Sequence, residues 1–189
     1  MITTIDKNTA LVLIDLQNSV VVVPTKPHSV EDVLKNVNDL IAAFRKKQLP
    51  VVLVNVKPSG AWMNARKEAK MPPFPNDENA YSITDKINAN KNDTYITKHT
   101  WNAFFETKLD NELKKKSITN IILGGISTSI GVEATARAAS ELGYNITLAT
   151  DAITDRNESA HYHSIQIIFP RLGETGTTKE IIETLEKAV

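Results

Sequence analysis

The chain has 189 residues, of which 41% are hydrophobic and 23% are charged, and it contains no cysteine. This length and composition indicate a single globular domain, residues 1–189, that is long enough to bury a substantial core. Lysine plus arginine and aspartate plus glutamate number 22 each, so there is no basic excess and we predict no nucleic-acid partner. The missing cysteines exclude disulfides, thiolate metal sites and thiol nucleophiles.

The apolar segments and the N-terminus indicate where the protein is expected to work. No stretch reaches the ~20 consecutive apolar residues that a transmembrane helix requires, so we predict no membrane partner. The opening residues MITTIDKNTA lack the basic start and the apolar centre of a secretory signal peptide. A cytoplasmic location is the resulting expectation.

The first third of the chain alternates between a strand pattern and a helix pattern. The run from Thr9 to Leu16 is apolar except for Asp15 near its end, which is typical of a strand covered on both faces. The stretch Val20–Val23 is apolar but stops at a proline, and we interpret it as an ordered loop or a short edge piece. Ser29 is the predicted N-cap of a helix whose apolar residues recur at helical spacing.

A long irregular segment separates the second predicted strand from the third. Residues 51–56 form the second strand, and Lys57 to Tyr81 then carries four prolines, which is typical of a lid or a binding loop. Trp62 in this segment can contact a substrate or a neighbouring subunit, although plain packing is the commoner role of a lone loop tryptophan. The third strand, Asp93 to Thr97, is followed directly by Lys98.

The remaining elements continue the alternation to the end of the chain. We predict helices at 109–116, 132–142, 158–169 and 178–187 and strands at 118–123, 145–150 and 172–175. Strands that alternate with helices predict a three-layer, doubly wound α/β/α fold around a six-stranded, mainly parallel sheet.

The segment from Ile118 to Thr135 is the part of the chain where a ligand is expected. An apolar run leads into Gly124 and Gly125, and hydroxyl residues and a further glycine precede a segment with helical periodicity. In an open α/β sheet, ligands bind at such carboxyl ends of strands, where free N–H groups of a helix start face an anionic group. The alternative is an ordinary connection in which the glycines only allow close packing.

Two ionisable residues, Asp15 and Lys98, end two other predicted strands at the same edge of the sheet. Together with the junction Ser127–Gly131, they bring three strand ends to one crevice, which indicates a site. The alternative is that Asp15 and Lys98 form a buried ion pair with a structural role only. Such pairs contribute little net stability, which weakens that alternative.

Three motifs in this order resemble the isochorismatase-like hydrolase family over roughly Leu11 to Arg171. They are LIDLQN at 13–18, the lysine at 98 and GGISTSIGVEATAR at 124–137. Most members of that family are cysteine hydrolases that use an Asp–Lys–Cys triad on amides such as nicotinamide. Asp15 and Lys98 match the first two members of the triad, whereas the family's cysteine falls at Gly131.

The glycine at position 131 decides the class of chemistry that the resemblance implies. A glycine cannot form a covalent acyl intermediate. The isochorismatases proper also lack the cysteine, and they hydrolyse a vinyl ether with the aspartate as general acid. Asp15 would then protonate the substrate and water would attack the cation. Burial would raise the pKa of Asp15 and Lys98 would lower it, and the sequence leaves the balance open.

We therefore predict a hydrolase without a thiol nucleophile that acts on a small carboxylated metabolite. The alternative is a catalytically silent member that binds a metabolite or serves as an assembly partner. Because Gly131 has no side chain, we expect space between it, Asp15 and Lys98 for a water or an anion.

The resemblance implies further features of the site. It implies a cis peptide at Ile126-Ser127, an oxyanion-type hole from the N–H groups of Ser127 and Gly131, and a homo-oligomer. The predicted catalytic residues are thus Asp15, Lys98 and Gly131. The predicted substrate contacts are Gln17, Trp62, Trp101, Ser127, Thr128 and Ile130.

We predict neither a metal nor another cofactor. Nicotinamidase-type relatives hold zinc with an Asp-x-His sequence after the second strand, and this chain has Asn55-Val56-Lys57 there. His161 and His163 are two residues apart and would lie on different faces of a helix. His99, adjacent to Lys98, is a candidate to reach the pocket.

Overall fold

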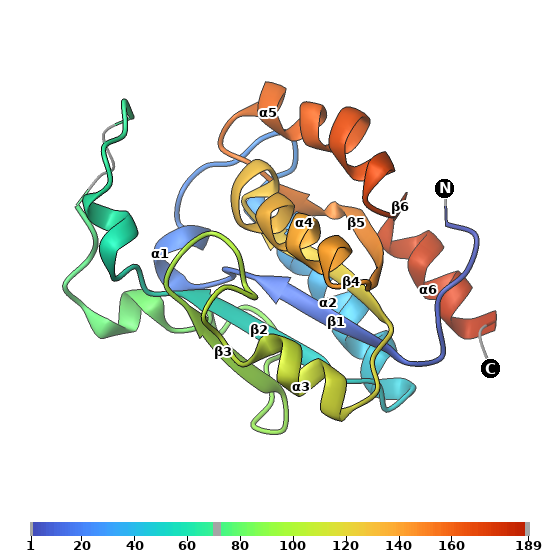
Figure 1. The fold of residues 1–189 in the computed structure, drawn as a ribbon. Coiled ribbons are helices and arrows are strands. Elements are labelled where there is room, and N and C mark those ends of the chain that lie inside the picture. Colours follow the sequence, from blue (N-terminus) through green and yellow to red (C-terminus); the bar gives the residue numbers. More distant parts are fainter. Residues whose placement is uncertain (1, 70–72, 188–189) are drawn as a thin grey trace.

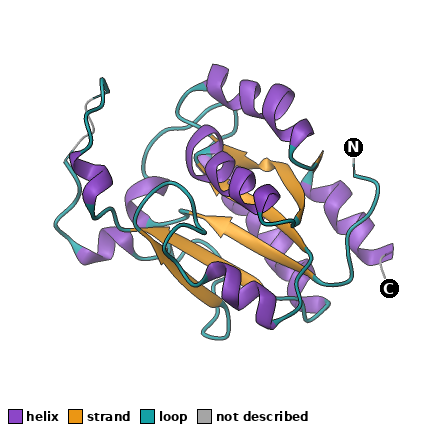
Figure 2. Ribbon diagram, in the orientation of Figure 1, coloured by secondary structure: helices purple, strands orange, loops and turns teal. Residues whose placement is uncertain are grey.

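The protein is a six-stranded parallel sheet between two layers of helices in the computed structural model, which describes residues 2–69 and 73–187 (Figures 1 and 2). The strands are β1 (Thr9–Ile14), β2 (Val51–Val56), β3 (Thr94–Lys98), β4 (Asn120–Ile126), β5 (Asn145–Thr154) and β6 (Glu174–Gly176). Their order in the sheet is β3-β2-β1-β4-β5-β6, and every neighbouring pair is parallel. The predicted doubly wound α/β fold is confirmed.

The helices cover both faces of this sheet (Figure 1). The α-helices are α1 (Asn18–Val21), α2 (Val30–Lys46), α3 (Leu109–Lys115), α4 (Glu133–Glu141), α5 (Glu158–His163) and α6 (Thr178–Lys187). Short 3-10 helices lie at Ala61–Asn64, Glu78–Tyr81 and Phe169–Arg171, and π-helical turns at Thr128–Val132 and Ser164–Ile168. In the part of the chain that is described, no helix is long and apolar enough to cross a membrane.

The apolar runs of the sequence form two cores, one on each side of the sheet. Along β1, Leu11 and Leu13 pack into the core under α2 and α6, whereas Val12 and Ile14 pack into the core under α3 and α4. Because side chains alternate between the faces of a strand, a strand covered on both sides has to be apolar throughout. Ser29 caps α2 as predicted, since its Oγ accepts the N–H of Asp32 at 3.1 Å.

The order of the strands brings the ends of β1 and β4 to the centre of the sheet. The chain runs from β1 to β2 and β3 on one side, returns to the centre for β4, and continues to β5 and β6 on the other side. Ligands bind where the progression of such a sheet reverses, at the carboxyl ends of the two central strands. Asp15 follows β1 and Ser127 follows β4, so both predicted motifs lie at this point.

Two short segments differ from the sequence expectations. Val20 and Val21, expected in a loop or edge piece, belong to helix α1, because their N–H groups donate to the carbonyl oxygen of Gln17. The sixth strand begins at Glu174 instead of residue 172, because the N–H groups at 172 and 173 still bond to the carbonyl oxygen of Phe169.

Two longer elements end at residues other than those predicted from the sequence. Strand β5 extends to Thr154, past the expected end at residue 150, because its register with β4 shifts beyond Leu148, and Ile153 and Thr154 then pair with Gly125 and Ile126. The helix expected over 158–169 is α-helical only to residue 163 and continues as a π-helical turn.

Candidate active site

Asp15 stands directly after β1 with its side chain turned into the protein. Its backbone has a φ of 54°, in the left-handed region that aspartate adopts more readily than most residues, and its N–H donates to Val54 O at 2.8 Å. The carboxylate is almost fully buried, and Oδ2 lies 2.9 Å from the Nζ of Lys98. The predicted ion pair between the two strand ends is therefore present.

Lys98 ends the edge strand β3 and reaches past β2 to the centre of the sheet. Only 1% of its surface is exposed, which is unusual for a lysine and requires partners for its ammonium group. Besides the contact with Asp15, Nζ donates a hydrogen bond of 2.6 Å to the carbonyl oxygen of Trp101. The ammonium is thus held between a carboxylate and a backbone carbonyl.

Burial dominates the electrostatics of the Asp15 carboxyl. Burial raises the pKa of Asp15 from 3.8 to about 6. The charge of Lys98 and its hydrogen bond to the carboxylate both lower this pKa, but their effect is smaller. The other carboxyl oxygen, Oδ1, is buried and has no hydrogen-bond partner among the described residues. A carboxyl with one oxygen on a cation and the other unpartnered can hold a proton on the second oxygen at mildly acidic pH.

Gly131 closes this arrangement from the turn that joins β4 to α4. A β-carbon built on Gly131 would lie 3.0 Å from Asp15 Oδ2, 3.2 Å from Lys98 Nζ and 2.9 Å from Ile14 Cγ2. The structure therefore brings the three predicted catalytic positions together. The expected open space at Gly131 was wrong, because Ile14 and the charged pair fill the volume that a side chain would take.

The loop before Gly131 is held by two side chains from the segment that follows β5. The peptide bond between Ile126 and Ser127 is cis. Thr128 is fully buried, and its hydroxyl lies 2.8 Å from Nδ1 of His161. The N–H and the hydroxyl of Ser129 both donate to Oδ2 of Asp155, at 2.7 and 2.9 Å. Thr128, predicted to contact substrate, therefore bonds inward to α5.

The other predicted substrate contacts differ in how far they are exposed to solvent. Gln17 is buried, and its side-chain amide bonds both the N–H and the carbonyl of Val56, which ties the end of β1 to the end of β2. Trp101 and Ile130 are half-exposed at the same edge of the sheet. The side chain of Trp62 lies outside what the structure describes. These positions leave Trp101 and Ile130 accessible to a ligand.

The histidines do not gather at Asp15. His99 Nδ1 lies 2.8 Å from the carbonyl oxygen of Lys57. His161 is buried and His163 is exposed, which confirms that the two lie on different faces. Burial lowers the pKa of His161 to about 4, with a further lowering from His28. Within residues 2–69 and 73–187, no three histidine or acidic side chains are close enough to hold a metal ion.

Three residues of the site were missed in the sequence. Asp155 and His161 hold the loop before Gly131, and Thr135 bonds the carbonyl oxygen of Gly131 from α4. The partners of Asp155 and His161 lie 26 and 33 residues away in sequence, so spacing gave no signal for them. Thr135 lies within the motif at 124–137. A threonine among the alanines of the predicted helix could have indicated a buried hydroxyl group that bonds to the backbone.

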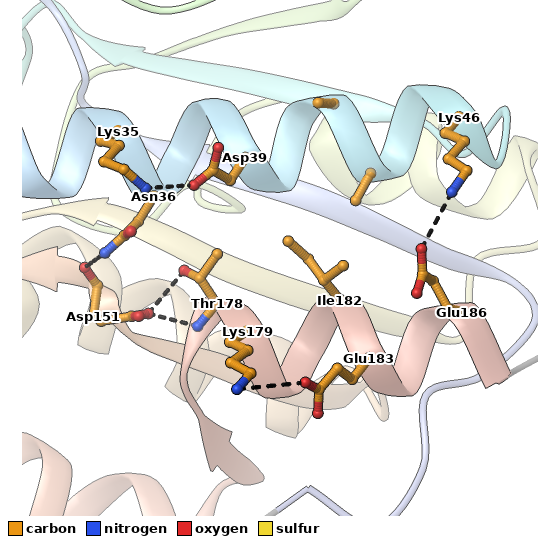
Figure 3. A pocket seen from close by; sticks show the side chains of 12 residues that line it. Lys35, Asn36, Asp39, Lys46, Asp151, Thr178, Lys179, Ile182, Glu183 and Glu186 are labelled. Carbon is orange, nitrogen blue, oxygen red and sulfur yellow. Dashed lines mark hydrogen bonds and ion pairs between the residues drawn. The ribbon is translucent and has the colours of Figure 1, made fainter.

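A groove of about 630 Å³ lies elsewhere, between α2 and α6 (Figure 3). Its apolar lining residues are Ala42, Ala43 and Ile182. Three ion pairs border it: Lys35–Asp39, Lys46–Glu186 and Lys179–Glu183. None of the three predicted catalytic residues lines the groove, so we do not assign the chemistry to it.

The parallel fold and the site at the ends of β1, β3 and β4 define a small α/β protein with a hydrolase fold. Residues 9–180 match the isochorismatase domain. The chain belongs to the isochorismatase family.

Similar proteins match almost the whole chain. The uncharacterized isochorismatase family protein YecD of Escherichia coli O157:H7 is 38% identical over 182 residues, which cover 95% of this chain and 97% of that protein. The uncharacterized isochorismatase family protein YwoC of Bacillus subtilis is 34% identical, with 95% of each chain covered. The structure of an isochorismatase family protein from Burkholderia thailandensis has a TM-score of 0.94 and 37% identity, and the match covers 98% of this chain and 100% of that one.

Proposed function

We propose that this chain hydrolyses a small carboxylated metabolite without a thiol nucleophile, with Asp15 as the general acid. The observation that carries the proposal is the state of the Asp15 carboxyl. It is buried, has one oxygen on Lys98, and has a second oxygen with no partner among the described residues. The carboxylated substrate class is inferred from the resemblance of the sequence to the isochorismatases proper, which also lack the cysteine.

In the proposed mechanism the proton moves from Asp15 Oδ1 to the substrate. For a vinyl ether, the proton adds to carbon, the double bond is lost and the ether carbon becomes cationic. Water attacks that carbon and releases a proton, which returns to the carboxylate. The hydroxyl of the resulting hemiketal then becomes the carbonyl of a keto product as the ether bond breaks, and its proton passes to the oxygen of the leaving alcohol. Lys98 stabilises the carboxylate that exists between the two proton transfers, because its ammonium lies 2.9 Å from Oδ2.

The test is a screen of the purified protein against small hydrolysable metabolites, isochorismate included. Hydrolysis of a carboxylated substrate by the wild type, and its loss in Asp15→Asn, would support the proposal. Tight binding of an acidic metabolite without turnover would instead favour a catalytically silent binding protein.

We expect the kcat/KM of hydrolysis to fall as the pH rises through about 6. Burial raises the pKa of Asp15 to about 6, and a general acid works only in its protonated form, which dominates below the pKa. The measurement is a kcat/KM profile between about pH 4.5 and 8, with circular dichroism at each pH to confirm the fold. A rate that rises with pH across this range would show that Asp15 acts as a base or not at all.

A further inference from the structure

We propose that Thr135 is a positioning residue that fixes the backbone carbonyl of Trp101 against Lys98 and so holds the ammonium group on Asp15. The inference rests on the proposed role of Asp15 as the acid. It concerns a residue that never touches the reacting atoms and acts through the segment between β3 and α3.

The side chain of Thr135 joins two parts of the site. Thr135 lies in α4 and is fully buried. Its hydroxyl donates to the carbonyl oxygen of Gly131 at 2.7 Å, one turn earlier in the chain, and accepts the N–H of Ala103 at 3.1 Å. Ala103 is also fully buried, so its N–H would otherwise lack a partner, at an appreciable cost in free energy. One hydroxyl group therefore ties the turn that carries Gly131 to the segment around Ala103.

That segment supplies the second partner of Lys98. Residues 99–108 connect β3 to α3 and contain neither a helix nor a strand in the structure. Their position therefore depends on individual contacts, of which the bond from Ala103 to α4 is one that spans 32 residues of sequence. Trp101, two residues before Ala103, accepts the 2.6 Å hydrogen bond from Nζ of Lys98.

A chain of contacts thus runs from Thr135 through Ala103 and Trp101 to Lys98 and Asp15. Nζ has to satisfy both the Trp101 carbonyl at 2.6 Å and Oδ2 of Asp15 at 2.9 Å. If the Ala103 anchor is lost, the carbonyl shifts and the ammonium is no longer fixed at its contact distance from the carboxylate. Lys98 is the charged group whose field acts on Asp15, and it lowers the pKa of that carboxyl. A looser contact therefore raises the pKa of Asp15.

The competing interpretation is that the Thr135 hydroxyl only satisfies the buried N–H of Ala103. Under that interpretation, Thr135→Val would lower the melting temperature and leave the titration of Asp15 unchanged. A positioning role predicts both effects. The two interpretations therefore differ in the titration.

The experiment is a carbon-13 NMR titration of the Asp15 side-chain carboxyl in the intact protein, in wild type and in variants. Thr135→Val removes the hydroxyl, and we expect the pKa of Asp15 to rise by about 0.5–1 unit, part of the ~1–3 units by which a contacting cation lowers it. Thr135→Ser keeps the hydroxyl and should restore the wild-type titration. Should Thr135→Val not fold, Thr135→Cys retains a weakly bonding group, and we expect a smaller shift of the same sign.

Thr184→Val is the matched control. The Thr184 hydroxyl makes the same kind of bond, to the carbonyl oxygen of Glu180 at 2.8 Å, but in α6 and away from the site. We expect no change in the Asp15 titration. If Thr135→Val folds and leaves the pKa of Asp15 at the wild-type value, the positioning role is wrong.

The titration needs no turnover, so it can be read even if the protein hydrolyses nothing. A rise in the pKa of Asp15 in a protein without activity would support the positioning role and count against the proposed function. With a substrate in hand, and at a pH below 6 where Asp15 is protonated in both proteins, Thr135→Val should lower kcat more than it raises KM, because a loosened Lys98 stabilises less well the carboxylate that proton donation leaves.

Discussion

Asp15→Asn is expected to abolish hydrolysis, with kcat/KM falling by about 10²-fold or more, the contribution typical of a general acid. Asparagine keeps the shape of the side chain but has no acidic proton to deliver from the position of Oδ1. That oxygen is buried and lacks a partner among the described residues, so no neighbouring group there replaces the lost donor. The measurement is kcat/KM on the substrate found in the screen, below and above pH 6.

The substitution also leaves Lys98 as a buried cation without its carboxylate. Removal of one partner from a buried pair costs about 3–5 kcal/mol of stability, so thermal unfolding has to be followed alongside activity. Asp39→Asn is the matched control, because Asp39 is an exposed carboxylate that lies 2.9 Å from Lys35 and outside the site. We expect wild-type activity for this control. Near-full activity of a folded Asp15→Asn protein would contradict the proposed mechanism.

The fold and the outline of the site could be predicted because both depend on patterns that are local in sequence. The continuous apolar runs of β1 and β4 mark strands covered on both faces, and alternation with helices fixes a parallel sheet. In such a sheet, strand ends share one edge. Asp15, Lys98 and Gly131 could therefore be expected together, and a β-carbon at Gly131 would contact the other two.

The parts that could not be predicted depend on packing between distant segments. Burial and Lys98 shift the pKa of Asp15 in opposite directions, and only the depth of burial in the folded chain shows that burial dominates. The inward bond of Thr128 to His161 required the position of α5 relative to β4, which no spacing encodes. The filled volume at Gly131 was missed for the same reason, since Ile14 and the charged pair close onto the backbone only in the assembled sheet.

Gly131→Ala should lower kcat/KM by up to about 10²-fold, the loss that a displacement of a catalytic group by about 1 Å can cause. The added β-carbon would lie 3.0 Å from Asp15 Oδ2 and 3.2 Å from Lys98 Nζ, both closer than ordinary contact allows. It would also lie 2.9 Å from Ile14 Cγ2, which belongs to a fully buried, branched side chain and has little room to move. Relief of all three contacts therefore requires the turn at position 131 to move as well as the charged pair, which changes the geometry between them.

Gly143→Ala is the control for the general effect of replacing a glycine. Gly143 follows the end of α4 with a φ of +84°, and a β-carbon there meets nothing within 4 Å. An alanine in this conformation costs about 1 kcal/mol of stability, because the left-handed region disfavours side chains. We expect a lower melting temperature and an unchanged kcat/KM, which separates loss of stability from displacement of the Asp15–Lys98 pair.

Gly131→Cys adds a larger side chain at the same position and supplies a thiol where the sequence resemblance places the family's cysteine. The glycine here lets Asp15 and Lys98 approach to 2.9 Å over the bare backbone, so the thiol would enter a volume that they already fill. We expect native hydrolysis to fall at least as far as in Gly131→Ala, with little amidase activity gained toward small amides. Labelling with a thiol reagent at neutral pH and assays on both substrate types measure this. A Gly131→Cys protein that keeps its native hydrolysis and becomes an efficient amidase would contradict this expectation. It would show that the Asp15–Lys98 pair tolerates a side chain at position 131, so that the glycine is not needed to let the pair lie close to the backbone.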